Sequence, residues 1–196
     1  FCTPITPRRG CLLHADPQTF WSLVAIGAVF TLARFSEAFL ILKANAEGLP
    51  LALTPLVLVA MNAVYMFAAY PLGSLSDRVS ARTMLVWGLI VLIAADLALA
   101  LLPGVAGAFV GVGLWGVHMA ATQGLFAKLV ADRSPSDLRG SAYGIFNLIT
   151  GLALLAASVI AGLAWDAAGP AATFLVGAGC AVVALAGLLV VPLARR

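Results

Sequence analysis

Six long apolar runs, joined by short polar connections, take up most of this chain of 196 residues. A helix needs about 20 mostly apolar residues to cross the hydrocarbon core of a bilayer, and each run is about that long. A backbone in lipid must satisfy its own N–H and C=O groups, as a helix does. We therefore expect an all-α membrane protein whose residues 20–193 form one bundle of six transmembrane helices, over residues 20–42, 54–75, 83–102, 105–130, 141–165 and 171–193.

The composition excludes several other classes of protein. Hydrophobic residues make up 63% of the chain and charged residues 10%, whereas ordinary soluble domains carry about 25% charged residues. The sequence has no phosphate-binding GxxxxGK[ST] loop and no HExxH or GxSxG motif, and His14 and His118 lie in different settings. We expect neither an enzyme nor a cofactor or metal site. The basic residues are scattered over short loops, so they do not indicate a nucleic-acid partner.

The basic residues predict how the helices are oriented. Short connections make neighbouring helices antiparallel, so six spans place both ends of the chain on one side. If that side is cytoplasmic, only Lys43 lies in an outside segment, in agreement with the positive-inside rule. The inside segments contain Arg8, Arg9, Arg78, Arg82, Arg133, Arg139, Arg195 and Arg196, with Lys128 close by. We expect residues 1–19 to end a cytoplasmic linker and residues 194–196 to form a cytoplasmic tail, at a bacterial inner membrane.

Two opposite charges fall inside the first apolar run. Arg34 and Glu37 are three residues apart, so on a continuous helix they share one face and can pair. A charge near the bilayer centre costs about 2.5–3.5 kcal/mol on insertion scales, and such residues persist when they are paired or functional. The pair is therefore either a neutral structural pair or part of a substrate or coupling site, and the sequence leaves both interpretations open.

Polar and aromatic residues form stripes at helical spacing on three of the expected spans. Such a stripe is typical of a face turned toward a water-filled cavity, although hydrogen bonding between helices explains any single residue equally well. Because three spans share the pattern, we expect a common substrate or coupling cavity that also includes Arg34 and Glu37. The candidate residues are Asn62 and Tyr65 on the second span, Trp115 and His118 on the fourth with Gln123 beside them, and Tyr143 and Asn147 on the fifth. Ala69, Thr122 and Thr150 continue the same three stripes at helical spacing.

A short charged loop, residues 73–82, separates the second and third spans. Asp77 precedes the third span, where a carboxylate favours a helix N-terminus. Arg78 and Arg82 can bridge to acidic or carbonyl groups of neighbouring helices at the same membrane face. We interpret Gly73, Asp77, Arg78 and Arg82 as a gating loop that holds one conformation closed; the alternative is a simple topology anchor.

This loop resembles that of the major facilitator superfamily of secondary transporters. The family repeats the pattern Gly-x-Leu-x-Asp-Arg-x-Gly-Arg-Arg. Here Gly73, Leu75, Asp77, Arg78 and Arg82 match it, with Ser80 in place of the usual glycine and Ala81 where a basic residue is common. Three further segments are similar to the family's helix seven, its entry into helix eleven and its exit toward helix twelve. These segments are residues 32–40, residues 137–144, and residues 162–166 with Gly169 and Pro170.

The resemblance implies the C-terminal half of a family transporter, built from two inverted three-helix repeats over residues 20–102 and 105–193. It implies that the first, second, fourth and fifth spans line the cavity, and that a six-helix N-terminal half is the partner. The chain also starts at Phe1 without the apolar core of a signal peptide, so we expect a fragment or one half of something longer.

The function that the resemblance implies is secondary active transport of a small organic solute by alternating access, coupled to protons. The favoured direction is export, and the favoured substrates are drug-like compounds. The alternatives are uptake of a sugar, a carboxylate or another metabolite, and a membrane sensor or scaffold that transports nothing. The sequence leaves the substrate, the coupling ion and the direction open.

Overall fold

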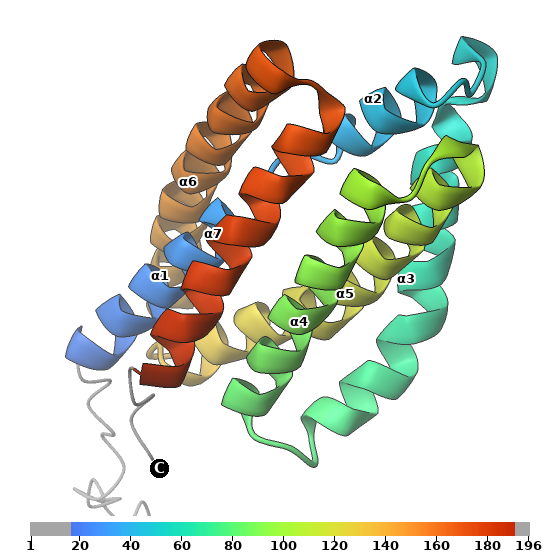
Figure 1. The fold of residues 1–196 in the computed structure, drawn as a ribbon. Coiled ribbons are helices and arrows are strands. Elements are labelled where there is room, and N and C mark those ends of the chain that lie inside the picture. The colour runs from blue at the N-terminus through green and yellow to red at the C-terminus, as the bar shows by residue number, and fades with distance from the viewer. Residues whose placement is uncertain (1–16, 191–196) are drawn as a thin grey trace, which may run out of the picture.

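The computed structural model describes residues 17–190, and this part of the chain is helical throughout apart from its connections (Figure 1). The expected cytoplasmic tail and most of the expected linker lie outside the described residues. The helices are α1 (Pro17–Leu32), α2 (Ala38–Ala46), a single 3-10 turn η1 (Leu51–Leu53), α3 (Pro55–Ser76), α4 (Ala81–Leu101), α5 (Gly104–Asp132), α6 (Arg139–Ala168) and α7 (Pro170–Val190).

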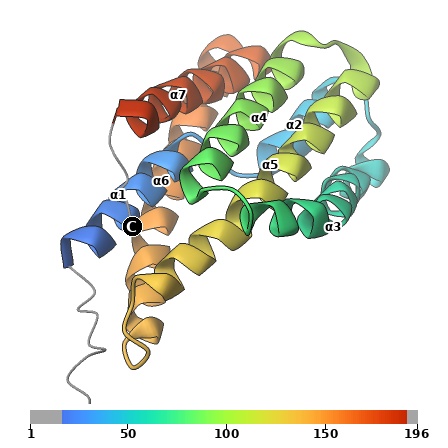
Figure 2. The ribbon, with the colours of Figure 1, turned by 90° about the horizontal axis from the view of Figure 1, so that it is seen from below.

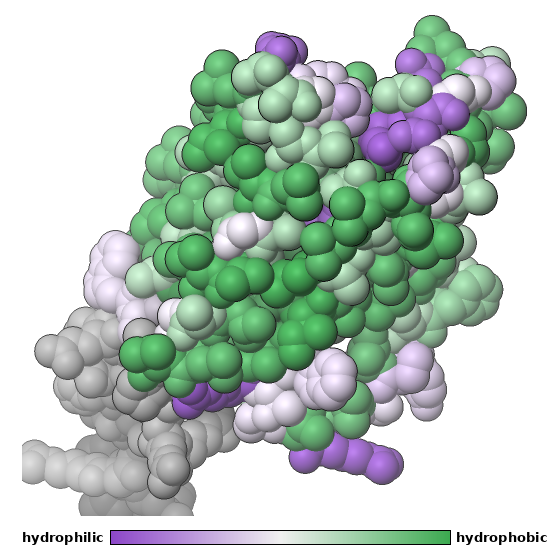
Figure 3. Space-filling view, viewed as in Figure 1, coloured by the Kyte–Doolittle hydropathy of each residue, from purple (hydrophilic) through white to green (hydrophobic). Residues whose placement is uncertain are grey.

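Five of these helices, α3 to α7, are long and apolar enough to cross a membrane. Many of their large apolar side chains point outward, among them Phe67 on α3, Leu163 on α6 and Val183 on α7. Figure 3 shows hydrophobic residues over the middle of the visible face and hydrophilic ones gathered toward its two ends. An apolar band of this kind is the surface that a bilayer covers, so the chain is an integral membrane protein.

The first expected span is interrupted, which corrects the prediction of one helix over residues 20–42. Helix α1 ends at Leu32, residues 33–37 are not helical, and α2 starts at Ala38. The backbone N–H of Ser36 donates a 3.1 Å hydrogen bond to Ser158 Oγ of α6, which satisfies one donor that the break leaves open. The break contains neither glycine nor proline, so contacts with distant residues, rather than local chain stiffness, hold it.

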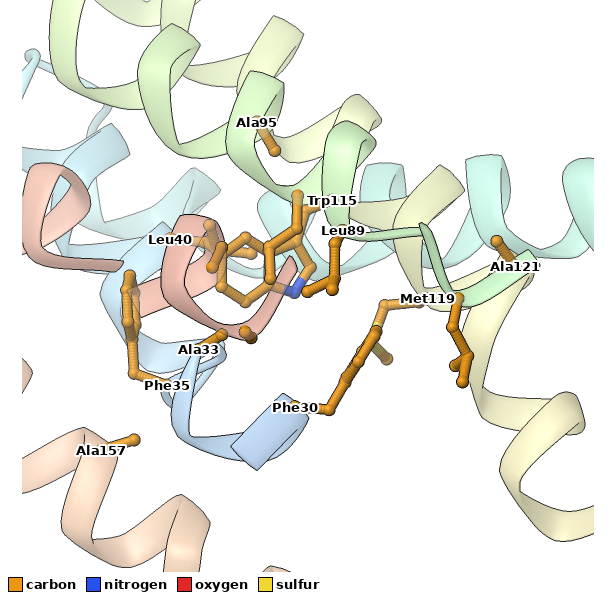
Figure 4. Packing of buried hydrophobic residues seen from close by; sticks show 14 of the residues in the cluster. Phe30, Ala33, Phe35, Leu40, Leu89, Ala95, Trp115, Met119, Ala121 and Ala157 are labelled. Carbon is orange, nitrogen blue, oxygen red and sulfur yellow. The ribbon is translucent and has the colours of Figure 1, made fainter. Parts of the chain in front are cut away.

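Aromatic packing fixes the break in place. The buried ring of Phe35 lies 5.4 Å from Trp115 of α5 and 5.5 Å from Phe174 of α7, measured between ring centroids. Figure 4 shows the buried residues around this point, with Phe30 and Phe35 on either side of Ala33. The core of the bundle therefore sits where the broken segment meets α5 and α7.

The helices form two groups. Helix α5 packs along both α3 and α4, α6 packs against α1 and α7, and the close pairing of α4 with α7 joins the groups (Figures 1 and 2). By contrast, α5 and α6, which follow each other in the chain, touch over a small region only. This leaves room between α1, α5 and α6, and the candidate site lies there.

Glycines mark some of the close helix contacts. A Cβ added at Gly116 of α5 would lie 2.6 Å from the carbonyl oxygen of Met61 on α3, so only glycine permits this approach. A Cβ added at Gly111 would lie 2.4 Å from Leu99 Cγ of α4. Gly144 and Gly151 of α6 have open space instead, so not every glycine in these helices serves packing.

Candidate functional site: a polar cavity between α1, α5 and α6

A cavity of about 270 Å³ opens between α1, α5 and α6, next to the break in the first span. Small-molecule sites commonly measure roughly 300–1,000 Å³, so this cavity is close to the size that a small organic molecule needs. Three groups line it: polar side chains, phenylalanines, and small or aliphatic residues. They are Arg34, Thr31, Thr122, Gln123, Asn147 and Thr150; Phe30, Phe126 and Phe146; and Gly151 and Leu154.

Two hydrogen-bond donors of the cavity wall converge on one sulfur atom. Arg34 Nη1 donates to Met119 Sδ at 3.0 Å, and Gln123 Nε2 donates to the same sulfur at 3.5 Å. A thioether is a weak acceptor, and a guanidinium carries five N–H donors. Both side chains are thus held in place by a partner that uses little of their hydrogen-bonding capacity.

The threonine hydroxyls of the cavity already donate hydrogen bonds to backbone carbonyls. Thr31, Thr122 and Thr150 each donate to a carbonyl of the preceding helical turn, at 2.7, 2.9 and 2.8 Å. Their oxygens keep acceptor capacity, but they supply no further donor in this arrangement. The donors that face a solute are therefore those of Arg34, Gln123 and Asn147.

Phenylalanines from three helices form the apolar part of the wall. The Phe30 and Phe126 rings meet edge to face at 5.1 Å, and the Phe126 and Phe146 rings lie 5.8 Å apart. Such pairs prefer offset or edge-on arrangements and hold each other in place. The cavity thus combines one cationic group with a rigid aromatic surface.

The structure separates Arg34 from Glu37. Both lie in or beside the non-helical break rather than on one helical face, and within residues 17–190 no ion pair joins them directly. They still interact through their charges. The neutral structural pair, one of the two interpretations that the sequence left open, therefore does not form, because the geometry that a continuous helix would provide is absent.

The cavity brings together three of the nine residues expected from the stripes and the charge pair: Arg34, Gln123 and Asn147. Glu37 lies half-buried beside the break, outside the lining. On α3, Asn62 is exposed and donates to the carbonyl of Leu58 on its own helix at 2.8 Å, and Tyr65 is half-buried against the core. Tyr143 lies near the start of α6, where its hydroxyl donates to the Ala127 carbonyl of α5 at 2.7 Å.

Trp115 and His118 lie inside the bundle instead of on a cavity wall. Both are fully buried. The His118 Nδ1 atom is 2.7 Å from the carbonyl oxygen of Gly88 on α4, and its ring stacks on Phe30 at 5.6 Å. This contact joins α5 to α4 and supports the cavity wall from behind, because Phe30 lines the cavity.

Six lining residues are not among the nine candidates: Thr31, Thr122, Thr150, Phe30, Phe126 and Phe146. Of these, Thr122 and Thr150 belong to the polar stripes of the sequence, at the same helical spacing as His118 and Asn147. No comparable signal marks the phenylalanines. An aromatic residue on an apolar helix fits lipid, core or cavity equally well.

The charged loop is shorter than expected, because α3 runs to Ser76 and α4 begins at Ala81. Asp77 is the C-cap of α3, which corrects its expected place at the start of α4. The N-cap of α4 is Ser80, whose Oγ accepts a 3.2 Å hydrogen bond from the Thr83 N–H. Serine is a preferred N-cap residue, and it fills this role here.

The loop is tied to two other helices. Lys128 Nζ of α5 donates to Asp77 Oδ1 at 2.8 Å, and this hydrogen bond, together with the lysine's charge, lowers the pKa of Asp77 below its ordinary value. Arg82 Nη2 donates to the Leu189 carbonyl of α7 at 2.5 Å, near the end of that helix. Gly73 and Arg78 are exposed, and a Cβ added at Gly73 would meet nothing within 4 Å.

Comparison with known proteins agrees with this architecture. A family model described as Major Facilitator Superfamily matches residues 17–196. The chain belongs to the major facilitator superfamily. It is a transporter-family chain, not an enzyme.

Two individual proteins support the assignment. The chain is 31% identical over 179 residues to an uncharacterized transporter of the same superfamily from Methanocaldococcus jannaschii. The matched region covers 88% of this chain and 44% of that relative. Its fold matches the crystal structure of an auto-inhibited POT family peptide transporter with a TM-score of 0.65 and 21% identity, over 92% of this chain and 39% of the other. The chain thus spans less than half the length of either protein.

Proposed function

We propose that this chain is part of a secondary active transporter that moves a small organic solute across the membrane by alternating access. The observation that carries the proposal is the cavity between α1, α5 and α6. It places Arg34, Gln123 and Asn147 on one wall of an otherwise apolar bundle. Polar and charged groups inside a membrane bundle are costly and mark solute or ion pathways.

The break between α1 and α2 supports the same proposal. Transporter sites are commonly formed where a membrane helix is interrupted, because the freed backbone and the helix ends face the solute. Here the interruption spans residues 33–37 and contains Arg34, a cavity residue. A segment held by packing rather than by helical hydrogen bonds is also a natural place for movement between two conformations.

The architecture that we propose is the C-terminal half of the transporter, with six spans in two inverted three-helix repeats. In it, α1 and α2 together form the first span. The partner is an N-terminal six-helix half of the same protein, which would close the cavity from its open side. The excess of basic residues on one side of the predicted topology supports cytoplasmic ends and a bacterial inner membrane.

For the energy source we propose a proton gradient, and for the direction, export of drug-like solutes. The acids that lie in the interior of the described spans are Glu37, half-buried at the break, and Asp96, buried in α4. Ionisable groups at such positions are candidates for proton relays. Uptake of a metabolite is the alternative, and the phenylalanine wall of the cavity favours solutes with apolar bodies.

For the loop between α3 and α4 we propose a gating role. Asp77 and Arg82 already bridge to α5 and α7, so movement of those helices would break or remake both contacts. The Asp77→Asn/Arg78→Ala double variant tests this role. Loss of flux with normal membrane insertion supports gating, and loss of the inserted protein means a role in folding.

A flux assay tests the transport function itself. The full-length protein that contains this chain is reconstituted in liposomes, and solute uptake is measured with and without an imposed pH gradient. We expect uptake that the gradient accelerates and that Arg34→Gln abolishes. Gradient-independent leakage, or no movement of any solute by correctly inserted protein, would leave a sensor or scaffold as the better interpretation.

A further inference from the structure

The cavity wall carries charge of one sign. Arg34 is its cation, and none of the lining residues that the structure describes is an acid. Glu37 interacts with Arg34 through charge but lies outside the lining and forms no direct ion pair with it. Beside buried apolar side chains, a charge acts more strongly than it does in bulk water. The wall therefore attracts anions and repels cations.

The donors of the wall are arranged for an acceptor that is stronger than the one they have. Arg34 and Gln123 both point at Met119 Sδ. A carboxylate or phosphate that displaces the thioether would accept from both side chains, and a guanidinium binds such groups through two parallel N–H donors. The hydroxyls of the three threonines donate to helix carbonyls and offer no further donor. The anion-binding end of the cavity is therefore the end at Arg34 and Gln123.

The rest of the wall suits an apolar body. Phe30, Phe126 and Phe146 form a connected set of rings on three helices. Rings of this kind bind flat apolar groups through offset or edge-on contacts. A second cavity of about the same volume, between α1, α4 and α7, is lined by aliphatic residues and Phe30, with Ser22 as its polar member. Of these two cavities, the one that contains Arg34 has the more polar lining.

We propose that this cavity binds a small organic anion with an aromatic or similarly flat apolar body. Arg34 and Gln123 hold its carboxylate or phosphate, and the three phenylalanines hold the body. This inference rests on the proposed transport function, since it names the class of solute. Among drug-like compounds, the inference selects anionic ones as the preferred solutes, and it excludes cations and sugars.

Four small probes and inorganic phosphate test the charge requirement. Thermal unfolding of the full-length protein in detergent is measured with benzoate, phenyl phosphate, benzamide, benzylammonium and inorganic phosphate. We expect benzoate or phenyl phosphate to raise the Tm in a saturable way, because a ligand that binds only the folded state stabilises it. The preferred anion identifies the anionic group. Benzamide has nearly the shape of benzoate without its charge, so it should have little effect, as should benzylammonium and inorganic phosphate.

Variants locate the site. Arg34→Gln should weaken binding of the preferred anion about tenfold or more, because it removes charge-assisted hydrogen bonds. Arg34→Lys keeps the charge but loses the planar fork, so it should bind with intermediate affinity. Arg139→Gln is the matched control, since Arg139 is exposed in the first turn of α6 and does not line the cavity. If Arg34→Gln does not fold, Gln123→Leu answers the same question.

The outcomes test the anion site separately from the proposed transport function. Equal stabilisation by benzamide or benzylammonium, or an anion effect that survives both Arg34→Gln and Gln123→Leu, overturns the inference. A protein that transports a neutral or cationic solute but is not stabilised by either anion keeps the transport function and loses the anion site. A protein that binds benzoate through Arg34 but moves no solute keeps the site and loses the transport function.

Discussion

Lys128 of α5 and Asp77 at the end of α3 form a 2.8 Å ion pair that fastens the charged loop to the C-terminal part of α5. A carboxylate at a helix C-terminus faces the negative end of the helix dipole, which is unfavourable. The positive charge of Lys128 offsets this repulsion. The loop is therefore held by a residue 51 positions away in the sequence, which local patterns around Asp77 do not reveal.

This pair should not act as a pH switch in the physiological range. Lys128 lowers the pKa of Asp77 below its ordinary 3.8. A lowered pKa means that the contribution of the pair to stability is fully present above pH 3.8 and is lost as the pH falls through the lowered value. We therefore expect Asp77→Asn to change flux by the same factor throughout the range from about pH 5 to 8.

A double-mutant cycle checks that Lys128 is the partner that matters. Lys128→Met should have the same effect on flux as Asp77→Asn, and the double variant should be no worse than either single variant. Additive losses would contradict the pairing. A ratio of Asp77→Asn flux to wild-type flux that changes between about pH 5 and 8 would contradict the assigned direction of the pKa shift.

Replacing Gly116 by alanine should separate α3 from α5. The added Cβ would lie 2.6 Å from the Met61 carbonyl oxygen and 3.3 Å from the Tyr65 nitrogen, and these backbone atoms cannot move aside as a side chain can. Overpacking of this kind costs typically about 1–3 kcal/mol. We expect a lower Tm in thermal unfolding of the purified protein. Gly113→Ala is the control on the same helix, because its nearest neighbour, Val64, is 4.0 Å away.

Replacing Asp96 by leucine should stabilise the protein. Asp96 is completely buried in α4, and neither carboxylate oxygen has a hydrogen-bond partner within the described residues. An unsatisfied buried polar group costs about 1–3 kcal/mol, and an apolar residue of similar size removes that cost. We expect a higher Tm for Asp96→Leu. Asp96→Asn keeps a polar group at the same buried position, so it should gain little.

The same variants test whether Asp96 takes part in coupling. A residue that lowers stability and is present nonetheless is a candidate for function. If it carries protons, Asp96→Leu should be more stable yet lose the acceleration of flux by a pH gradient. Unchanged gradient dependence in both variants would remove Asp96 from the proposed coupling path and leave Glu37.

The long apolar helices were predictable from the sequence because apolar length is a local property. The interruption at residues 33–37 was not, because Ser158, Trp115 and Phe174, which hold it, lie far along the chain. The helical period alone predicted a continuous helix, on which Arg34 and Glu37 could pair; within residues 17–190 the structure has neither the continuous helix nor a direct ion pair between them.

Membership of the cavity was only partly predictable, for a related reason. In a soluble helix, an apolar face identifies the core. In a membrane helix the core and the lipid are both apolar, so periodicity does not separate them. Polar residues on a stripe can then face a cavity, as Gln123 and Asn147 do, or a neighbouring helix, as His118 does. Side-chain contacts decide between the two, and those depend on the packed bundle.

Filling the open space beside Gly151 should reduce solute binding without harming the fold. Gly151 lines the cavity, and a Cβ added there would meet nothing within 4 Å, so Gly151→Val would extend into the space proposed for the apolar body. An added or missing methylene in such a pocket changes affinity by about 10-fold or more. We expect weaker benzoate binding, measured by titration, with an unchanged Tm of the solute-free protein. Gly144→Val on the same helix also has open space but does not line the cavity, so it should bind benzoate normally. Equal losses in both variants would show that α6 responds to bulk anywhere along this face, and that the cavity beside Gly151 is not the binding site.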